Sequence, residues 1–181
     1  MNTTKLYLIR HGETDGNRTG VLMGSTDTPL NDHGRQQAAA LSERVNALEV
    51  DAIFSSPLSR AVETATLVFG DTQPIITDSS LQEFHFGDWE GMHFADIARE
   101  YPEVWQMWLT DWEQTRIPGG EALNSYLHAL AATTNPVGLL GAIYIIEGTG
   151  QRIVPHLLPL LREHLHLPPD CLRFLSYHGA T

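Results

Sequence analysis

One stretch decides the fold of this chain: Leu8-Ile9-Arg10-His11-Gly12-Glu13-Thr14. The run 5–9 that leads into it is apolar and partly β-branched, which predicts a short buried strand. The strand therefore ends on Arg10, His11 and Gly12. In open α/β sheets, ligands bind in the crevice outside the carboxyl ends of the strands, so this triplet is placed for chemistry rather than for core packing. Gly12 has no Cβ, which lets a ligand approach the backbone closely.

The residues that follow predict a loop and then an amphipathic helix. Residues 15–30 are rich in Gly, Asn, Thr, Asp and Pro without periodicity, so we expect a loop that starts beside His11 and folds over it. Asn31 suits the N-cap of a helix. Apolar residues then recur at spacings of three and four, the pattern of a helix that packs on a sheet: Ala38, Leu41, Val45 and Leu48.

A second strand and a second helix come next. The run 51–56 predicts a short strand, and Pro57 suits the first position of a helix that continues to about Phe69. A third strand is expected at 74–77. Strand, helix and strand in this order predict a parallel sheet and therefore an α/β fold. Arg60 falls in the first turn of the second helix, where unpaired N–H groups and a partial positive charge favour an anion.

The segment 81–91 combines aromatic residues, carboxylates and glycines without a period. This mixture is typical of a loop that shapes a substrate site, and a turn packed by its own aromatic side chains has the same composition. We interpret His85 and His93 as loop or surface histidines, with contact between His85 and substrate as the alternative. Four tryptophans are expected to cover the core or the pocket mouth: Trp89, Trp105, Trp108 and Trp112.

Composition limits the classes of function. With 181 residues, of which 42% are hydrophobic, the chain can bury the core of one domain, or of one domain plus a fragment. Its formal net charge of −11 argues against general affinity for nucleic acid or anionic membranes, so an anion site must be a local positive pocket. Cys171 is the only cysteine, and no signal-peptide pattern opens the chain. No apolar run reaches the roughly 18 residues that a membrane helix needs, so we expect a cytoplasmic protein.

Four motifs in this order resemble the histidine phosphatase superfamily, also called the phosphoglycerate-mutase-like fold. They are the segments 8–17, 24–30, 55–61 and 81–91. The resemblance implies an α/β three-layer sandwich with a mostly parallel sheet. It also implies hydrolysis of a small phosphorylated metabolite without a metal or an organic cofactor. Three further segments are most similar to the α-ribazole phosphatases of cobalamin synthesis: 86–90, 108–112 and 118–121.

The resemblance implies roles for individual residues. His11 is the expected nucleophile, which carries the phosphoryl group as a phosphohistidine, and the carbonyl of Gly12 orients it. Arg10 and Arg60 are expected to hold the phosphoryl oxygens, because planar guanidinium groups match these oxygens and neutralise their charge in the transition state. Asn17 adds a neutral hydrogen-bond donor on the same grounds.

Glu83 is expected to protonate the leaving alcohol as general acid and then to activate water as general base. Bound phosphate should raise the pKa of this carboxyl. Simpler interpretations exist for these residues, since an Arg-His-Gly triplet also occurs by chance and an arginine on a helix is more often solvated. Three nearby carboxylates compete with Glu83 for its role: Glu13, Asp88 and Glu90.

The resemblance ends after Glu121. The superfamily closes its phosphate pocket with a second histidine in a Ser-His-Gly-Gly-like turn, and the sequence contains no such turn. The nearest pattern places Glu147 and Gly148 where Ser and His belong, and a carboxylate there would repel phosphate. Three outcomes stay open: a phosphatase of reduced activity, a non-catalytic phosphate-binding protein, and an inactive fusion.

The segment 124–181 instead resembles a part of the haem-oxygenase-like, iron-containing oxidases. On that resemblance Glu147 and His178 are two metal ligands, since a carboxylate and an imidazole suit non-haem iron. Further ligands belong after His178, so we expect no complete metal site, and an oxidase fragment is the remotest alternative.

We therefore predict a phosphatase-like α/β domain over 1–123 and a mainly helical, grafted segment over 124–181 that leaves the sheet incomplete. A diverged phosphatase whose last third mimics the other family is the alternative. The sequence leaves the oligomeric state open.

Overall fold

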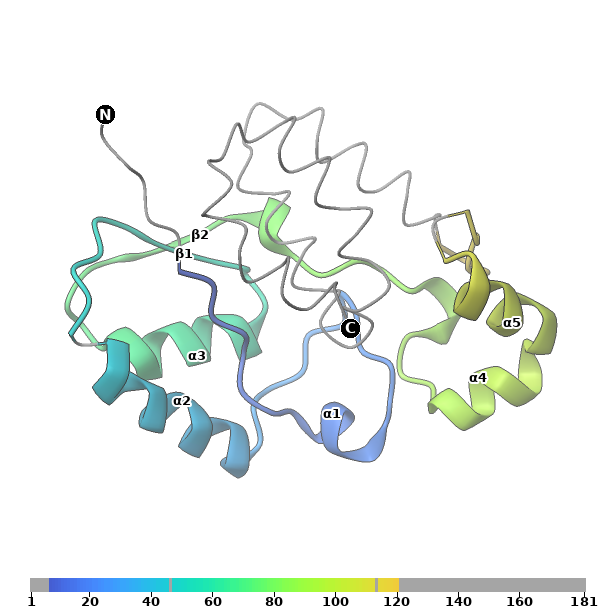
Figure 1. Ribbon diagram of the computed structural model, residues 1–181, viewed down its shortest axis with the longest axis horizontal. Coiled ribbons are helices and arrows are strands. Elements are labelled where there is room, and N and C mark those ends of the chain that lie inside the picture. The colour runs from blue at the N-terminus through green and yellow to red at the C-terminus, as the bar shows by residue number, and fades with distance from the viewer. Residues whose placement is uncertain (1–6, 46, 113, 121–181) are drawn as a thin grey trace.

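The computed structural model describes residues 7–45, 47–112 and 114–120 (Figure 1). Its two strands are β1 (Ile53–Ser55) and β2 (Ile75–Thr77). The α-helices of this part are α1 (Asp15–Thr19), α2 (Asp32–Val45), α3 (Ser59–Phe69), α4 (Phe94–Glu100) and α5 (Pro102–Thr110). Two single 3-10 turns, η1 (Ser79–Leu81) and η2 (Gly87–Trp89), interrupt the long connection between β2 and α4.

The sheet is parallel, as the order of strand, helix and strand predicts. β1 and β2 pair in the register Ile53 with Ile75, Phe54 with Ile76 and Ser55 with Thr77, and α3 is the connection between them. Figure 1 shows α2 and α3 packed side by side along the two strands. The described residues thus supply the parallel sheet and one helical layer of the predicted α/β sandwich. The predictions for 124–181 and for its junction with the first domain lie outside the described residues.

The core between these helices uses the predicted apolar stripe. Ala38 and Val45 of α2 are buried together with Val68 of α3. Partly buried side chains complete the cluster: Ile9, Leu41, Leu48, Leu67 and Phe69. Asn31 is the predicted N-cap, since its Oδ1 accepts a hydrogen bond from the N–H of Gly34 at 2.8 Å.

The strand prediction for the run 5–9 is wrong over its described part. Tyr7, Leu8 and Ile9 carry no strand assignment, and Tyr7 and Leu8 are 41% and 43% exposed. A strand exists only where a neighbouring backbone completes its hydrogen-bond ladder, and among the described residues β1 pairs with β2 alone. An apolar run gives burial propensity but does not specify that partner.

The loop prediction for 15–30 is wrong over its first five residues, which form α1. Thr14 and Asn17 cap this helix reciprocally: the Thr14 hydroxyl accepts from the Asn17 N–H at 3.2 Å, and Asn17 Oδ1 accepts from the Thr14 N–H at 3.0 Å. Gly20 ends the helix in the left-handed conformation with φ 74°. Capping therefore creates a helical turn in a segment without hydrophobic periodicity.

The start of α3 also differs from the prediction. The helix begins at Ser59, two residues after Pro57, so the proline does not occupy its first position. Asp27 of the preceding loop supplies the cap instead, because its Oδ1 accepts from the Ser59 N–H at 2.7 Å and from the Ser59 hydroxyl at 2.8 Å. The loop 24–30 is thereby anchored to the N-terminus of α3.

An aromatic cluster joins the segment 84–89 to α5. Trp89 is completely buried, and its ring centroid lies 5.8 Å from that of Trp105 and 5.9 Å from that of Trp108. Phe86 meets Phe84 at 5.1 Å and Trp108 at 6.0 Å. The prediction that the tryptophans cover the core is confirmed for Trp89 by its burial. The segment is a turn packed by its own aromatic side chains, which fixes the residues between them.

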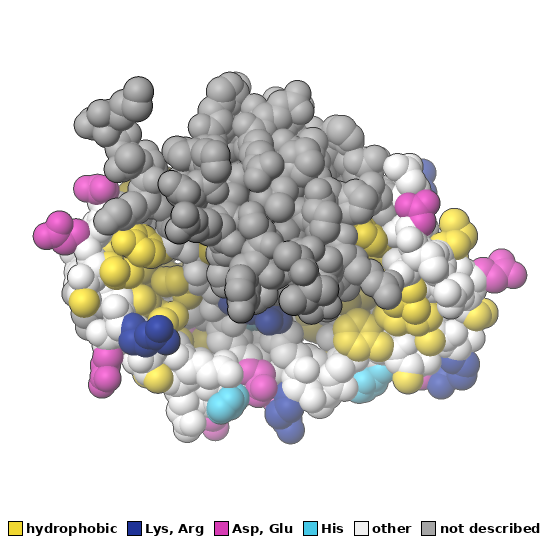
Figure 2. All heavy atoms as spheres, viewed as in Figure 1, with side chains coloured by type: hydrophobic (Ala, Val, Ile, Leu, Met, Phe, Trp, Pro, Cys, Tyr) yellow, Lys and Arg dark blue, Asp and Glu magenta, His cyan; other side chains and the backbone are white. Residues whose placement is uncertain are grey.

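The outer surface of α4 and α5 is partly apolar. Figure 2 shows yellow side chains gathered at the end of the molecule that carries these helices, and the exposed ones include Phe94, Met107 and Leu109. Within the described ranges, no helix has the length and apolarity to span a membrane.

Candidate active site

His11 is held in one tautomer by the backbone. Its Nδ1 lies 2.7 Å from the carbonyl oxygen of Gly12, and because a carbonyl only accepts, Nδ1 carries the proton and Nε2 keeps its lone pair. Burial, together with the charges of Arg60 and Arg10, lowers the pKa of His11 to about 4 against the opposing effect of the hydrogen bond to Gly12. The imidazole is therefore neutral near pH 7, as a nitrogen nucleophile must be.

The backbone next to His11 is also fixed by Thr64 of α3. The Gly12 N–H donates to Thr64 Oγ1 at 3.0 Å, and this hydroxyl donates in turn to the carbonyl of Arg60 at 2.7 Å. A Cβ at Gly12 would overlap the carbonyl group of Gly34, so glycine is needed here for close packing between two backbone segments. The histidine loop is thus tied to α2 and α3.

Arg60 is a buried residue with an exposed fraction of 2%, so the interpretation as a solvated helix residue is wrong. Its Nη1 donates to the carbonyl of Thr26 at 2.9 Å, and its Nη2 donates to the carbonyl of Gly24 at 2.7 Å. The same Nη2 bonds Oε2 of Glu83 at 2.8 Å. The guanidinium is therefore oriented by a loop that lies more than thirty residues away in the sequence.

Glu83 combines burial with a neighbouring cation. Burial is the main cause that raises the pKa of Glu83 to about 7; Arg60 and Arg10 oppose the rise, and the charge of Glu90 contributes to it. Near neutral pH this carboxyl is present in both its protonated and its ionised form. Glu13 and Glu90, which compete with Glu83 for the acid role in the sequence, bind Asn31 and the loop 24–26 respectively.

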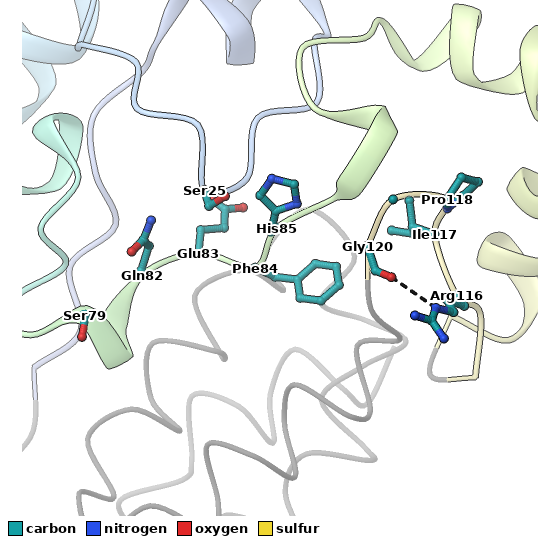
Figure 3. Close-up of a pocket in the computed structure, with 11 residues that line it drawn as sticks. Ser25, Ser79, Gln82, Glu83, Phe84, His85, Arg116, Ile117, Pro118 and Gly120 are labelled. Carbon is teal, nitrogen blue, oxygen red and sulfur yellow. Dashed lines mark hydrogen bonds between the residues drawn. The ribbon is translucent and has the colours of Figure 1, made fainter.

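A pocket of about 900 Å³ opens beside Glu83. Its walls come from the segments 82–85 and 116–120, together with Ser25 and Ser79 (Figure 3). The backbone just after the first segment is joined to the second, since the Asp88 N–H donates to the carbonyl of Pro118 at 2.7 Å. Figure 3 shows Glu83 extending toward the loop of Ser25, with Arg116 on the far side of the pocket. The pocket gives a substrate's organic group a place next to the acid.

The structure brings four of the five predicted residues together. Arg10 and Arg60 act electrostatically on both His11 and Glu83, so all four belong to one charged cluster. Asn17 lies in α1, where its amide oxygen is engaged with Thr14, and it is exposed. Its role as a phosphate donor stays a prediction.

Sequence reasoning missed the segment 116–120 and the part that Glu90 plays. The run Pro118-Gly119-Gly120 is singled out in the sequence only by a family resemblance, although a glycine pair after a proline also predicts a turn. Gly119 has φ 70° and forms the pocket wall. Within the described ranges, no group of three or more His, Cys, Asp or Glu side chains is arranged to hold a metal ion. The proposed ligands Glu147 and His178 lie outside those ranges.

Residues 6–132 match the sequence profile of the histidine phosphatase superfamily, branch 1. The chain belongs to this superfamily. It is 37% identical over 123 residues to the adenosylcobalamin/α-ribazole phosphatase of Escherichia coli K12, a match that covers 67% of this chain and 61% of that protein. The chain therefore spans about three fifths of the length of this relative.

Solved histidine phosphatase structures agree with this assignment. An α-ribazole-5'-P phosphatase structure from Escherichia coli matches with a TM-score of 0.65 at 31% identity, covering 91% of this chain and 70% of that one. A mycobacterial glucosyl-3-phosphoglycerate phosphatase complexed with VO3 matches with a TM-score of 0.61 at 29% identity, covering 83% and 69%. The phosphoglycerate-mutase-like fold predicted from the motifs is confirmed.

Proposed function

We propose that this histidine phosphatase hydrolyses phosphomonoesters through a phosphohistidine at Nε2 of His11. The observation that carries the proposal is the state of His11: a neutral imidazole, held by the carbonyl of Gly12, within the field of two arginines. A neutral nitrogen attacks phosphorus, and the guanidinium groups attract the phosphate that it attacks.

The first step transfers the phosphoryl group to the enzyme. The lone pair of His11 Nε2 forms a bond to phosphorus while the bond from phosphorus to the ester oxygen breaks. Arg10 and Arg60 neutralise the charge on the phosphoryl oxygens. Protonated Glu83 gives its proton to the departing oxygen, which leaves as an alcohol into the adjoining pocket.

The second step returns the enzyme to its starting state. The carboxylate of Glu83 takes a proton from water, the water oxygen bonds to phosphorus, and the P–N bond to His11 breaks. Inorganic phosphate leaves, with His11 neutral and Glu83 protonated again. A carboxyl group with a pKa of about 7 suits both duties, because the ideal acid–base catalyst has a pKa near the working pH.

We propose α-ribazole 5'-phosphate as the substrate, in cobalamin synthesis. Two observations support this choice: the similarity to α-ribazole phosphatases in sequence and in structure, and a pocket of about 900 Å³. The pocket combines the aromatic ring of Phe84 with the polar groups of Gln82 and Arg116, which suits a leaving group that has both an aromatic and a hydroxylated part.

A second candidate function is phosphate binding without turnover. It is favoured by one observation: at the pattern nearest to a Ser-His-Gly-Gly-like turn, Glu147 and Gly148 stand where Ser and His belong. In that case Arg10 and Arg60 would bind phosphate or vanadate, and His11 would not be phosphorylated.

The deciding experiment measures hydrolysis of p-nitrophenyl phosphate and of α-ribazole 5'-phosphate in EDTA, which excludes contaminating metal-dependent phosphatases. His11→Ala is compared with His93→Ala, a matched variant at an exposed histidine, with the folding of each checked by circular dichroism. Turnover that His11→Ala abolishes and His93→Ala retains supports the phosphohistidine route. Binding of inorganic phosphate without turnover in the folded wild type supports the second candidate and contradicts the first.

A further inference from the structure

Five hydrogen-bond donors converge on the carboxylate of Glu90. Its carboxylate accepts from the N–H groups of Gly24, Ser25 and Thr26 at 3.2, 3.1 and 3.1 Å. It also accepts from the Thr26 hydroxyl and from the N–H of Phe86 at 2.9 Å. Three successive backbone N–H groups that converge on one point form a concavity for an anion. Here a carboxylate of the protein fills that concavity.

The opposite side of the same loop holds Arg60. The carbonyls of Gly24 and Thr26 accept from Nη2 and Nη1 of Arg60 at 2.7 and 2.9 Å, while the N–H groups of these residues bind Glu90. The loop therefore lies between a carboxylate and a guanidinium, and the Gly24–Ser25 peptide bonds both, since its carbonyl accepts from Arg60 and its N–H donates to Glu90. A Cβ at Gly24 would overlap Glu90 and the Phe84 carbonyl, so the loop is seated against this carboxylate without space to spare.

We propose that Glu90 is the positioning residue of the phosphate site: it orders the loop 24–26, and the carbonyls of that loop aim the guanidinium of Arg60. The inference rests on the proposed function for the identity of the anion. Charge supports it, because burial would raise the pKa of Glu90, yet the hydrogen bonds from Thr26, Phe86 and Gly24 hold that pKa below its usual value. Glu90 thus stays ionised and keeps its donors engaged.

The test compares Glu90→Gln with Glu63→Gln. Glu63 is a carboxylate of α3 that pairs with Arg35 at 2.6 Å, so Glu63→Gln controls for the removal of a negative charge from the helix that carries Arg60. In Glu90→Gln an amide NH2 replaces one carboxylate oxygen, so a donor faces N–H donors and the loop loses one of its two acceptor oxygens. We expect kcat/KM for p-nitrophenyl phosphate to fall about a hundredfold, as for a misplaced catalytic contact, with weaker competitive inhibition by inorganic phosphate. Glu63→Gln should change neither.

A double-mutant cycle with Arg60→Lys separates positioning from general stabilisation. A lysine cannot bond both loop carbonyls as a guanidinium does, so the effect of Glu90→Gln should nearly vanish in the Arg60→Lys background. Equal fold losses in the two backgrounds would show that Glu90 acts independently of Arg60, and the proposal would then be wrong.

A readout that does not depend on turnover is the set of Arg60 guanidinium proton signals in an NMR spectrum, assigned by their loss in Arg60→Lys. These signals should be protected from exchange in the wild type and lost in Glu90→Gln. Thr26→Val removes the hydroxyl that donates to Glu90 and should weaken the protection from exchange. This variant replaces Glu90→Gln in the test if Glu90→Gln does not fold. Unchanged signals in both variants contradict the positioning role. A wild type that neither binds phosphate nor hydrolyses esters contradicts the proposed function alone, while the signals still test Glu90.

Discussion

The two sides of the site are built differently. On the phosphate side, Arg60 is 2% exposed, and its guanidinium bonds two carbonyls and a carboxylate at 2.7 to 2.9 Å. On the pocket side, Arg116 is exposed, and its Nε donates to the carbonyl of Gly120 at 3.3 Å. One arginine is fixed by its surroundings and the other is held loosely at a pocket wall.

This difference indicates which part of the reaction each side controls. A phosphoryl group has the same shape in every substrate, so a rigid, buried arginine can be oriented for it in advance. The organic group varies between substrates, and a pocket lined by two turns can change without disturbing the charged cluster. We therefore expect substitutions on the phosphate side to change catalysis for all substrates, and those on the pocket side to change the preference among them.

The largest expected effect follows from replacing Glu83, which lies between the two sides. Glu83→Gln cannot protonate a leaving group, so kcat/KM for an alkyl phosphate, which reports the phosphoryl-transfer step, should fall about a thousandfold. The loss should be smaller for p-nitrophenyl phosphate, because nitrophenolate leaves readily without a proton. Steady-state kinetics with both substrates measure this contrast. Asp88→Asn, at an exposed carboxylate of the same segment, should retain activity, and an equal loss there would contradict the assignment of the acid.

The raised pKa of Glu83 also predicts how stability depends on pH. Its pKa of about 7 in the folded protein exceeds the ordinary value of 4.5, so the folded state holds this proton when the unfolded state has released it. The stabilising contribution is complete below pH 4.5 and is lost as the pH rises through 7. Relative to the wild type, Glu83→Gln should therefore gain about 3 kcal/mol in the free energy of unfolding over this range.

Urea unfolding of both proteins across this pH range measures the difference, in which all other titrating groups cancel. A separate comparison of the wild type with His11→Ala provides a check of opposite sign. The pKa of His11 is lowered from 6.5 to about 4, so its contribution to the free energy of unfolding is lost as the pH falls through that interval. A constant difference between Glu83→Gln and the wild type would mean that the pKa of Glu83 is not raised.

The packing behind His11 predicts the next effect. Alanine normally stabilises a helix relative to glycine by about 1 kcal/mol. At Gly34 of α2, however, a Cβ would overlap the backbone of Glu13, so Gly34→Ala should instead destabilise the protein by about 2 kcal/mol and reduce activity. Gly16 of α1 is the matched control, because its Cβ would meet only the flexible side chain of Met23. Thermal unfolding of the two variants compares them; equal midpoints would contradict the packing argument.

The sequence predicts those parts of the site that depend on local signals. His11 and Arg60 each stand after a short apolar run, while their roles come from the family resemblance, and the parallel pairing of β1 and β2 follows from the alternation of strand and helix. Such signals arise within a few residues, where propensity and periodicity act.

The rest depends on contacts between distant residues. Glu90 binds a loop that precedes it by 64 to 66 residues, and no spacing pattern in the sequence predicts such a contact. The same holds for Asp27, which caps α3 from a distance of 32 residues, whereas a local reading favours Pro57. The short helix α1 differs from these cases, because it has a local signal, the Thr-x-x-Asn capping box, but its residues lack an apolar stripe.

The smallest expected effect belongs to the pocket side and tests the comparison directly. Arg116 is exposed, and a solvent-screened contact of this kind contributes about 1 kcal/mol or less, so Arg116→Ala should raise KM for α-ribazole 5'-phosphate by no more than about fivefold. Both kcat and the kinetics with p-nitrophenyl phosphate should stay unchanged, because that leaving group is too small to need the far wall. Steady-state kinetics with the two substrates separate these quantities. An equal rise in KM for both substrates would place Arg116 among the residues that hold phosphate. The division between a fixed side and an adaptable side would then no longer describe this site.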